Sequence, residues 1–270
     1  MTKTTTPSDL KERLISALIL APIVIFIAWL GGLWFVGLMI VMALIMYWEW
    51  TTITVRALDI RRDLGAGISI VALIIAFVLM PSLKPIMLSF ALIAIGAFVV
   101  GVLKQKIGWI VAGIGVASSL ALCLIYIRNT PNADIGLILL IFTCFSVWAA
   151  DIFAYFVGRT VGGPKLMPKV SPKKTWSGFL GGLLGAIITG SVVALVALPD
   201  KLFEFSLIAL FLALAAQAGD LIESAIKRHF NVKDASNLIP GHGGVLDRVD
   251  GLALAAYALV LIHAIGFLNH

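Results

Sequence analysis

The sequence predicts an all-α integral membrane protein with about nine transmembrane helices. Of its 270 residues, 61% are hydrophobic and only 13% are charged, which leaves too few polar side chains to cover a soluble globule of this size. The apolar residues form continuous runs rich in Leu, Ile and Ala. A membrane β-barrel would instead show segments of about ten residues with alternating polarity.

The expected spans are separated by short polar turns or loops, and each is close to the ~20 residues that a helix needs to cross the hydrocarbon core. They cover residues 14–30, 33–50, 65–80, 85–103, 108–127, 135–157, 178–198, 203–226 and 250–268. The first span runs into the second without a small-residue cleavage site. We therefore interpret it as a retained helix rather than a removable signal.

The positive charges predict how the helices are oriented. If the N-terminus is cytoplasmic, three basic residues, Lys84, Arg128 and Lys201, fall on the outer side, and the other 17 of the 20 Lys and Arg lie inside. This bias predicts an N-inside, C-outside topology. The net charge of +6 then reflects membrane topology rather than binding of nucleic acid.

Two long inner loops, residues 158–177 and 227–249, carry most of the Pro, Gly and Lys of the second half. The outer loops are too short to form a domain or a binding site, so we expect the function to face the cytoplasm. We accordingly divide the chain into N-terminal scaffold helices (1–130) and a catalytic membrane domain (131–270).

Four carboxylates lie at the inner ends of two expected spans, where an ionisable residue is costly and therefore a functional candidate. At ~100° per residue, Asp220 and Glu223 share one helical face with Lys227. Asp247 and Asp250, three residues apart, also share a face. If the loop between the two helices brings their ends together, the four carboxylates cannot all stay ionised in a low dielectric.

A divalent cation would remove this conflict, and oxygen ligands without cysteine favour Mg²⁺ over Zn²⁺. We therefore expect Asp220, Glu223, Asp247 and Asp250 to bind Mg²⁺. The structural alternative is that the two later aspartates favour a helix N-terminus beside Arg248 and that Glu223 pairs with Lys227.

Basic and glycine residues supply the complementary half of a phosphate site. Glycines let backbone N–H groups approach an anion closely, and lysines before the seventh span lie where a helix N-terminus attracts phosphate. Anchoring of those lysines to lipid headgroups is an alternative, and a turn histidine satisfied by backbone is an alternative for His242. The predicted phosphate-binding residues are Lys173, Lys174, Thr175, Lys227, Arg228, Lys233, His242, Gly243, Gly244 and Arg248.

The stretch from Ser224 to Asp250, SAIKRHFNVKDASNLIPGHGGVLDRVD, resembles the signature of the phosphatidate cytidylyltransferase (CDP-diacylglycerol synthase) family of bacterial membranes. The resemblance extends upstream to the Asp151-Ile-Phe-Ala-Tyr155 segment and to Ser171-Pro-Lys-Lys-Thr175. One departure is Ser177, where members often carry Glu or Gln.

This resemblance implies a nucleotidyltransferase of phospholipid synthesis. Such an enzyme transfers a cytidylyl group from CTP to phosphatidate, makes CDP-diacylglycerol and pyrophosphate, and requires Mg²⁺. The implied location is the bacterial cytoplasmic (inner) membrane, with several membrane passes and the active site facing the cytoplasm.

The residues fit that reaction as follows. Asp220, Asp247 and Asp250 hold the metal, with Glu223 bound to it or adjacent. Lys227 belongs with the three aspartates to the catalytic group, and the other basic residues neutralise the triphosphate and the lipid phosphate. Asp151 and Tyr155 form the far wall of the site, without an assigned chemical step.

A transporter or flippase of an anionic substrate is the competing hypothesis, because intramembrane carboxylates also serve as coupling-ion sites. It predicts charges near the midplane and access from both sides. The charges of this chain gather at one boundary, which favours an enzyme. Gly181, Gly182 and Gly185 permit close helix packing within one chain or between two, so a homodimer is left open.

Overall fold

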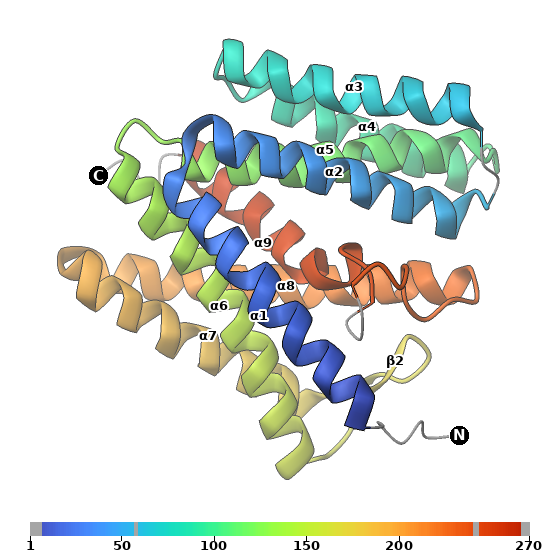
Figure 1. The fold of residues 1–270 in the computed structure, drawn as a ribbon. Helices are drawn as coiled ribbons and strands as arrows, with labels where there is room; N and C mark the ends of the chain where they lie inside the picture. The colour runs from blue at the N-terminus through green and yellow to red at the C-terminus, as the bar shows by residue number, and fades with distance from the viewer. Residues whose placement is uncertain (1–6, 57–58, 240–242, 266–270) are drawn as a thin grey trace. The chain divides into compact units, whose positions relative to one another are not determined.

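The computed structural model describes residues 7–56, 59–239 and 243–265, with side chains from Leu18 onward. In these ranges it forms nine α-helices and one short β-hairpin (Figure 1). The elements are α1 Pro7–Leu30, α2 Gly32–Thr54, α3 Ile60–Leu79, α4 Lys84–Gly101, α5 Ile107–Arg128, α6 Ala133–Thr160, β1 Lys165–Met167, β2 Ser171–Thr175, α7 Trp176–Ala197, the 3-10 turn η1 Pro199–Lys201, α8 Leu202–His229 and α9 Leu246–Ala264. Each expected span corresponds to one of the nine helices.

Seven helices in the described part of the chain, α2 to α8, are long and apolar enough to cross a membrane. The protein is therefore a multi-pass membrane protein. The apolar part of α1 with described side chains, Leu18–Leu30, is shorter, and α9 is not among the seven. A total of nine crossings and the N-inside orientation stay predictions.

The inner loop 158–177 is more ordered than expected, because it contains the antiparallel hairpin of β1 and β2. Lys165 pairs with Thr175 and Met167 pairs with Ser171, with an irregularity between the two pairs. The hairpin leads directly into α7, so it fixes where that helix begins.

The chain divides into two compact units whose boundaries differ from the predicted division. The first unit contains residues 1–125 and 234–247, and the second contains residues 126–233 and 248–270. The predicted boundary at residue 130 is close to the first of these. Residues 234–247 lie in the first unit, and the division into scaffold helices and a catalytic domain stays a prediction.

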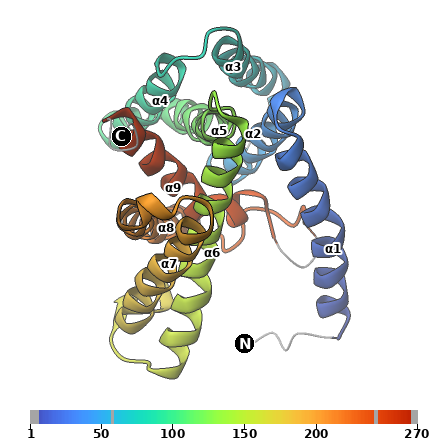
Figure 2. The ribbon, with the colours of Figure 1, turned by 90° about the vertical axis from the view of Figure 1, so that its left-hand side faces the viewer.

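In the first unit, α2 packs against α1 and α3, and α4 packs closely on α5 (Figures 1 and 2). A Cβ on Gly96 of α4 would lie 2.6 Å from the carbonyl oxygen of Gly108, so only glycine fits this crossing. Trp50 ties α2 to α5, because its indole nitrogen donates a 2.7 Å hydrogen bond to the Trp109 carbonyl.

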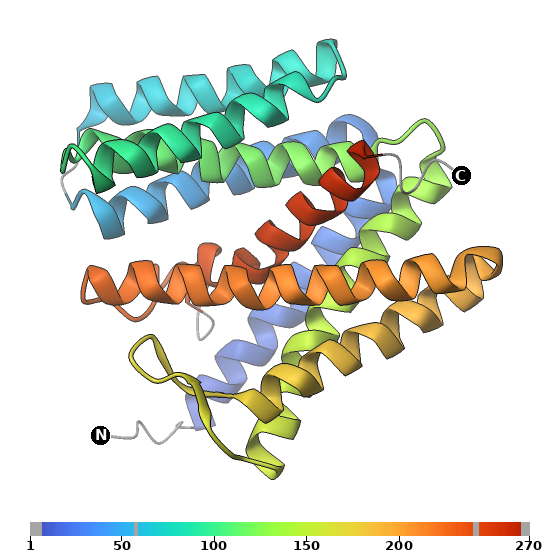
Figure 3. The same ribbon diagram turned by 180° about the vertical axis from the view of Figure 1, so that it is seen from behind.

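The second unit is built on the packing of α6, α7 and α8 (Figure 3, where α7 is gold and runs beside the green α6). Small residues make this approach possible. A Cβ on Gly181 would lie 2.6 Å from Cβ of Val157, and one on Gly182 would lie 2.8 Å from the Ala150 carbonyl oxygen. The glycines of α7 thus serve packing within the chain, and a homodimer stays a prediction.

Candidate functional site

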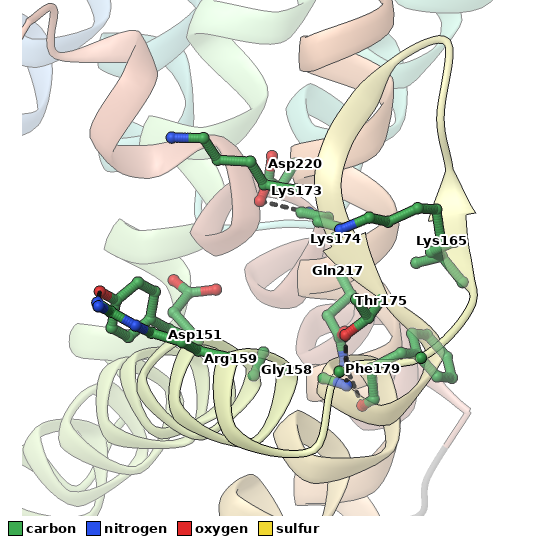
Figure 4. Close-up of a pocket in the computed structure, with 16 residues that line it drawn as sticks. Asp151, Gly158, Arg159, Lys165, Lys173, Lys174, Thr175, Phe179, Gln217 and Asp220 are labelled. Carbon is green, nitrogen blue, oxygen red and sulfur yellow. Dashed lines mark hydrogen bonds and ion pairs between the residues drawn. The ribbon is translucent and has the colours of Figure 1, made fainter. Parts of the chain in front are cut away.

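A cavity of about 730 Å³ lies within the second unit, between α6, the hairpin, the start of α7 and α8 (Figure 4). This volume is in the range of small-molecule and cofactor sites. The cavity is lined by four cationic and two anionic side chains, namely Arg159, Lys165, Lys173, Lys174, Asp151 and Asp220. Tyr155 and Gln217 also line it.

One ion pair joins the charged groups of the cavity. Lys174 on β2 forms an ion pair with Asp220 on α8, with 2.5 Å between Nζ and Oδ2. Arg159 donates a 2.8 Å hydrogen bond to the hydroxyl of Tyr155, one turn earlier on α6. Asp151 on α6 lines the cavity and interacts electrostatically with both members of the Lys174–Asp220 pair. The site thus offers cations to an anionic ligand and carboxylates to a cation.

Helix capping explains why the hairpin holds its position over the cavity. Thr175 is the N-cap of α7, and its Oγ1 accepts a 3.1 Å hydrogen bond from the Gly178 amide, as short hydroxyl side chains do at helix starts. The hydroxyl of Ser177 donates to the Gly162 carbonyl. Thr175, predicted to bind substrate, thus lines the cavity while its hydroxyl caps the helix. Ser177, without an assigned role, anchors the segment before the hairpin.

A second group of carboxylates lies where α8 meets α9. A Cβ on Gly219 of α8 would lie 2.5 Å from the Asp250 carbonyl oxygen, so the two backbones are in close contact. The charge of Asp250 acts on Asp220 and Glu223 of α8. Asp220, Glu223 and Asp250 therefore converge within the second unit, as the spacing along the sequence predicted.

Glu223 is the least satisfied of these carboxylates. It is buried, and its ion pair with the buried Lys227 spans 3.1 Å between Oε1 and Nζ. This approach is not a well-directed hydrogen bond, because neither carboxylate oxygen has a hydrogen-bond partner among the described residues. The pairing of Glu223 with Lys227, which is the structural alternative to metal binding, is thus present, and Asp250 also interacts with the Glu223 carboxylate.

Asp247 lies in the first unit and has a different environment. Its Oδ2 accepts hydrogen bonds from the amides of Ala235 at 2.8 Å and Gly244 at 2.9 Å. The Gly243 amide donates to the Ile239 carbonyl at 3.1 Å. Both glycine N–H groups that we expected to bind an anion are thus used within the chain, and their role toward substrate stays a prediction.

Several predicted binding residues lie away from the cavity or outside the described residues. Arg228 is exposed and donates a 2.8 Å hydrogen bond to the Val232 carbonyl. Lys233 and Arg248 are exposed, and neither lines the cavity. His242 lies outside the described residues. The cavity therefore brings together Lys173, Lys174, Thr175 and Asp220, and Asp151 and Tyr155 also line it.

Glu49 is a buried carboxylate that the sequence reasoning missed. It lies on α2, in the first unit, with none of its surface exposed. It accepts hydrogen bonds from the Ser236 hydroxyl at 2.6 Å and from the amides of Val245 and Leu246 at 2.9 and 2.7 Å. The available signal was an ionisable residue inside an expected span, but its partners lie 187 to 197 positions away.

The carboxylates fit a divalent metal in their chemistry. Within the described ranges, no three or more His, Cys, Asp or Glu side chains are already arranged as metal ligands. The unused buried oxygens of Glu223, with Asp220 and Asp250 nearby, are nevertheless the hard oxygen donors that Mg²⁺ prefers. A metal there would also relieve the repulsion between these anions.

Comparison with known proteins gives one consistent result. A family model described as the Cytidylyltransferase family matches residues 11–265. A Brucella abortus protein named phosphatidate cytidylyltransferase is 40% identical over 262 residues, covering 96% of this chain and 94% of that protein. A Rickettsia bellii protein of the same name is 35% identical and covers 96% and 92% of the two chains. A Bacillus subtilis protein, again of that name, is 45% identical over 133 residues, 48% of this chain and 49% of its own.

Proposed function

Because the chain belongs to the Cytidylyltransferase family, we propose that it transfers a cytidylyl group from CTP to phosphatidate. The products are CDP-diacylglycerol, an intermediate of phospholipid synthesis, and pyrophosphate. The protein is thus an integral membrane nucleotidyltransferase. The observation that carries this function is the cavity of the second unit, which places four cationic side chains beside two carboxylates.

The reaction needs alignment and charge neutralisation more than acid–base chemistry. An oxygen of the phosphatidate phosphate attacks the α-phosphorus of CTP and forms a new P–O bond. The bond from that phosphorus to the bridging oxygen breaks, and pyrophosphate leaves with the electron pair. Since the attacking phosphate is already an anion, the protein's main task is to hold two anions in line and stabilise the charge that develops on the leaving group.

The cationic side chains of the cavity serve that task. Lys173 and Lys174 lie on β2 just before the N-terminus of α7, where the helix dipole also favours phosphate. Arg159 faces the cavity from α6. Together they neutralise a triphosphate from two sides, and the Lys174–Asp220 ion pair keeps the lysine in place until the nucleotide binds.

Mg²⁺ is part of the proposal, with Asp220 and Asp250 as ligands and with Asp247 and Glu223 as the further candidates. When bound, the metal supplies charge neutralisation at the phosphoryl oxygens. Lys227 keeps its ammonium 3.1 Å from Glu223, so it balances the charge of the carboxylate group. These assignments rest on the donor set and on the unused oxygens of Glu223.

The two substrates come from different phases, which constrains the location of the reaction. CTP is water-soluble, whereas phosphatidate stays in the bilayer with its acyl chains among lipids. We propose that the cavity opens to the cytoplasm and to the inner leaflet of a bacterial cytoplasmic membrane. The bias of the basic residues toward one side supports this orientation.

A reconstituted assay tests the function. Purified protein is incubated with labelled CTP, phosphatidate vesicles and Mg²⁺, and CDP-diacylglycerol and pyrophosphate are measured. We expect equal amounts of both products, formed only when lipid and nucleotide are present together. Absence of lipid-dependent pyrophosphate release would refute the enzymatic function and would favour a transporter.

A further inference from the structure

We propose that Glu49 is a positioning residue for the reaction, acting as a cap supplied by α2 for the start of α9. Its carboxylate accepts two backbone hydrogen bonds, from Val245 and Leu246, where α9 begins. The first N–H groups of a helix have no partner inside the helix, and a carboxylate there is favoured by the helix dipole. The inference rests on the proposed function for its effect on turnover, but not for its effect on structure.

The hydrogen bonds of Glu49 and Asp247 alternate along the described residues of one segment, 235–239 and 243–247. Asp247 holds the amides of Ala235 and Gly244, while Glu49 holds Ser236 and the two residues that follow Gly244. Both anions are therefore needed to fix the segment. Asp247 is a candidate metal ligand, so the geometry points to Glu49 as the residue that sets where this carboxylate lies.

The shape of the site admits a carboxylate and little else. Three donors converge on Glu49, two on Oε1 and one on Oε2. In a Gln side chain one of these oxygens becomes an NH₂ group, which would face a backbone N–H in either orientation. Gly244 also leaves room for the carboxylate, because a Cβ there would lie 2.5 Å from Oε1 and 2.8 Å from Oε2.

Glu49→Gln is the first variant to test, with Glu204→Gln as the matched control at the start of α8. Loss of a group that orients a metal ligand typically lowers activity by about 10- to 100-fold, and we expect kcat of Glu49→Gln to fall in that range. The KM for phosphatidate should stay unchanged, because Glu49 positions the segment and contacts no substrate. Glu204→Gln should keep wild-type kcat.

A readout that does not depend on activity is amide hydrogen exchange in the ligand-free protein in detergent. In Glu49→Gln the amides of Val245 and Leu246 should exchange about tenfold faster, the factor that corresponds to 1.4 kcal/mol. Amides in α5 should exchange at the wild-type rate. Glu49→Asp keeps the charge on a shorter side chain, so we expect it to restore part of both the protection and kcat.

Two outcomes would overturn the inference. One is wild-type kcat together with wild-type exchange at residues 245 and 246 in Glu49→Gln. The other is faster exchange in α5 by the same factor, because it would show a general loss of stability rather than release of one segment. If the wild-type protein makes no CDP-diacylglycerol, the proposed function fails, while the exchange experiment still decides whether Glu49 caps α9.

Discussion

The crossing of α6 and α7 beneath the cavity gives the sharpest prediction, because it can be perturbed by one methyl group. In Gly178→Ala the new Cβ would lie 2.6 Å from the Ala154 carbonyl oxygen and 3.1 Å from Oγ1 of Thr175, the N-cap of α7. An ordinary contact begins at 3.4 Å, so relief of this overlap requires the two helices to move apart by about 0.8 Å.

The expected cost differs for stability and for catalysis. Overpacking of this kind destabilises by about 1–3 kcal/mol, whereas a displacement of about 1 Å at a reacting centre can lower a rate by about 100-fold. We therefore expect CDP-diacylglycerol formation by Gly178→Ala to fall by about two orders of magnitude. The midpoint of thermal unfolding should fall by about 2–4 °C per kcal/mol, leaving most of the protein folded at the assay temperature.

The control is Gly37→Ala on α2, where a Cβ would meet nothing within 4 Å. This variant should unfold at or above the wild-type temperature, because Ala favours a helix over Gly, and it should keep full activity. Wild-type turnover in Gly178→Ala would refute the claim that close contact of α6 and α7 sets the cavity geometry.

Three further predictions concern charge at the proposed site. Asp247→Asn should abolish CTP-dependent turnover in purified, correctly inserted protein, because an amide cannot replace an anion that accepts backbone hydrogen bonds or binds metal. Near-normal activity of this variant would reject the role of Asp247 as a metal ligand. Lys174→Gln breaks the ion pair with Asp220 and should raise KM for CTP about tenfold, or 1.4 kcal/mol, whereas Lys169→Gln in the hairpin turn, outside the cavity lining, should not. Chelation of divalent cations should stop the reaction and added Mg²⁺ should restore it, whereas full activity with EDTA would remove the metal from the mechanism.

The helices were predictable because the requirement that a membrane places on the backbone is met within each apolar segment itself. A continuous apolar run satisfies its own backbone only as a helix, so composition alone located each of the nine helices. That Asp220 and Glu223 lie on the same face of one helix was also predictable, because residues three apart on a helix share a face. Their convergence with Asp250 followed from the expectation that two adjacent helix ends meet.

Features that depend on distant residues could not be predicted in this way. The hairpin of β1 and β2 lies in a sequence rich in Lys and Pro, without the alternating apolar residues that indicate a strand. Its strands pair with each other, and its ends are held where Thr175 caps α7 and where the Ser177 hydroxyl donates to the Gly162 carbonyl. Glu49 was missed because nothing around it in the sequence shows that its partners are Ser236, Val245 and Leu246.

The hydrogen bonds of the carboxylates separate those that shape the protein from those available to a ligand. Glu49 is surrounded by three donors, and Asp247 by two backbone amides, so each already has partners that hold a segment in place. Glu223 has unused oxygens at almost no exposure. A buried anion in that state is costly unless a cation completes its environment. Lys227 supplies part of that charge, and a metal bound with the substrate would supply directed coordination. This difference predicts that loss of Glu223 changes the Mg²⁺ requirement, whereas loss of Glu49 loosens the backbone at Val245 and Leu246.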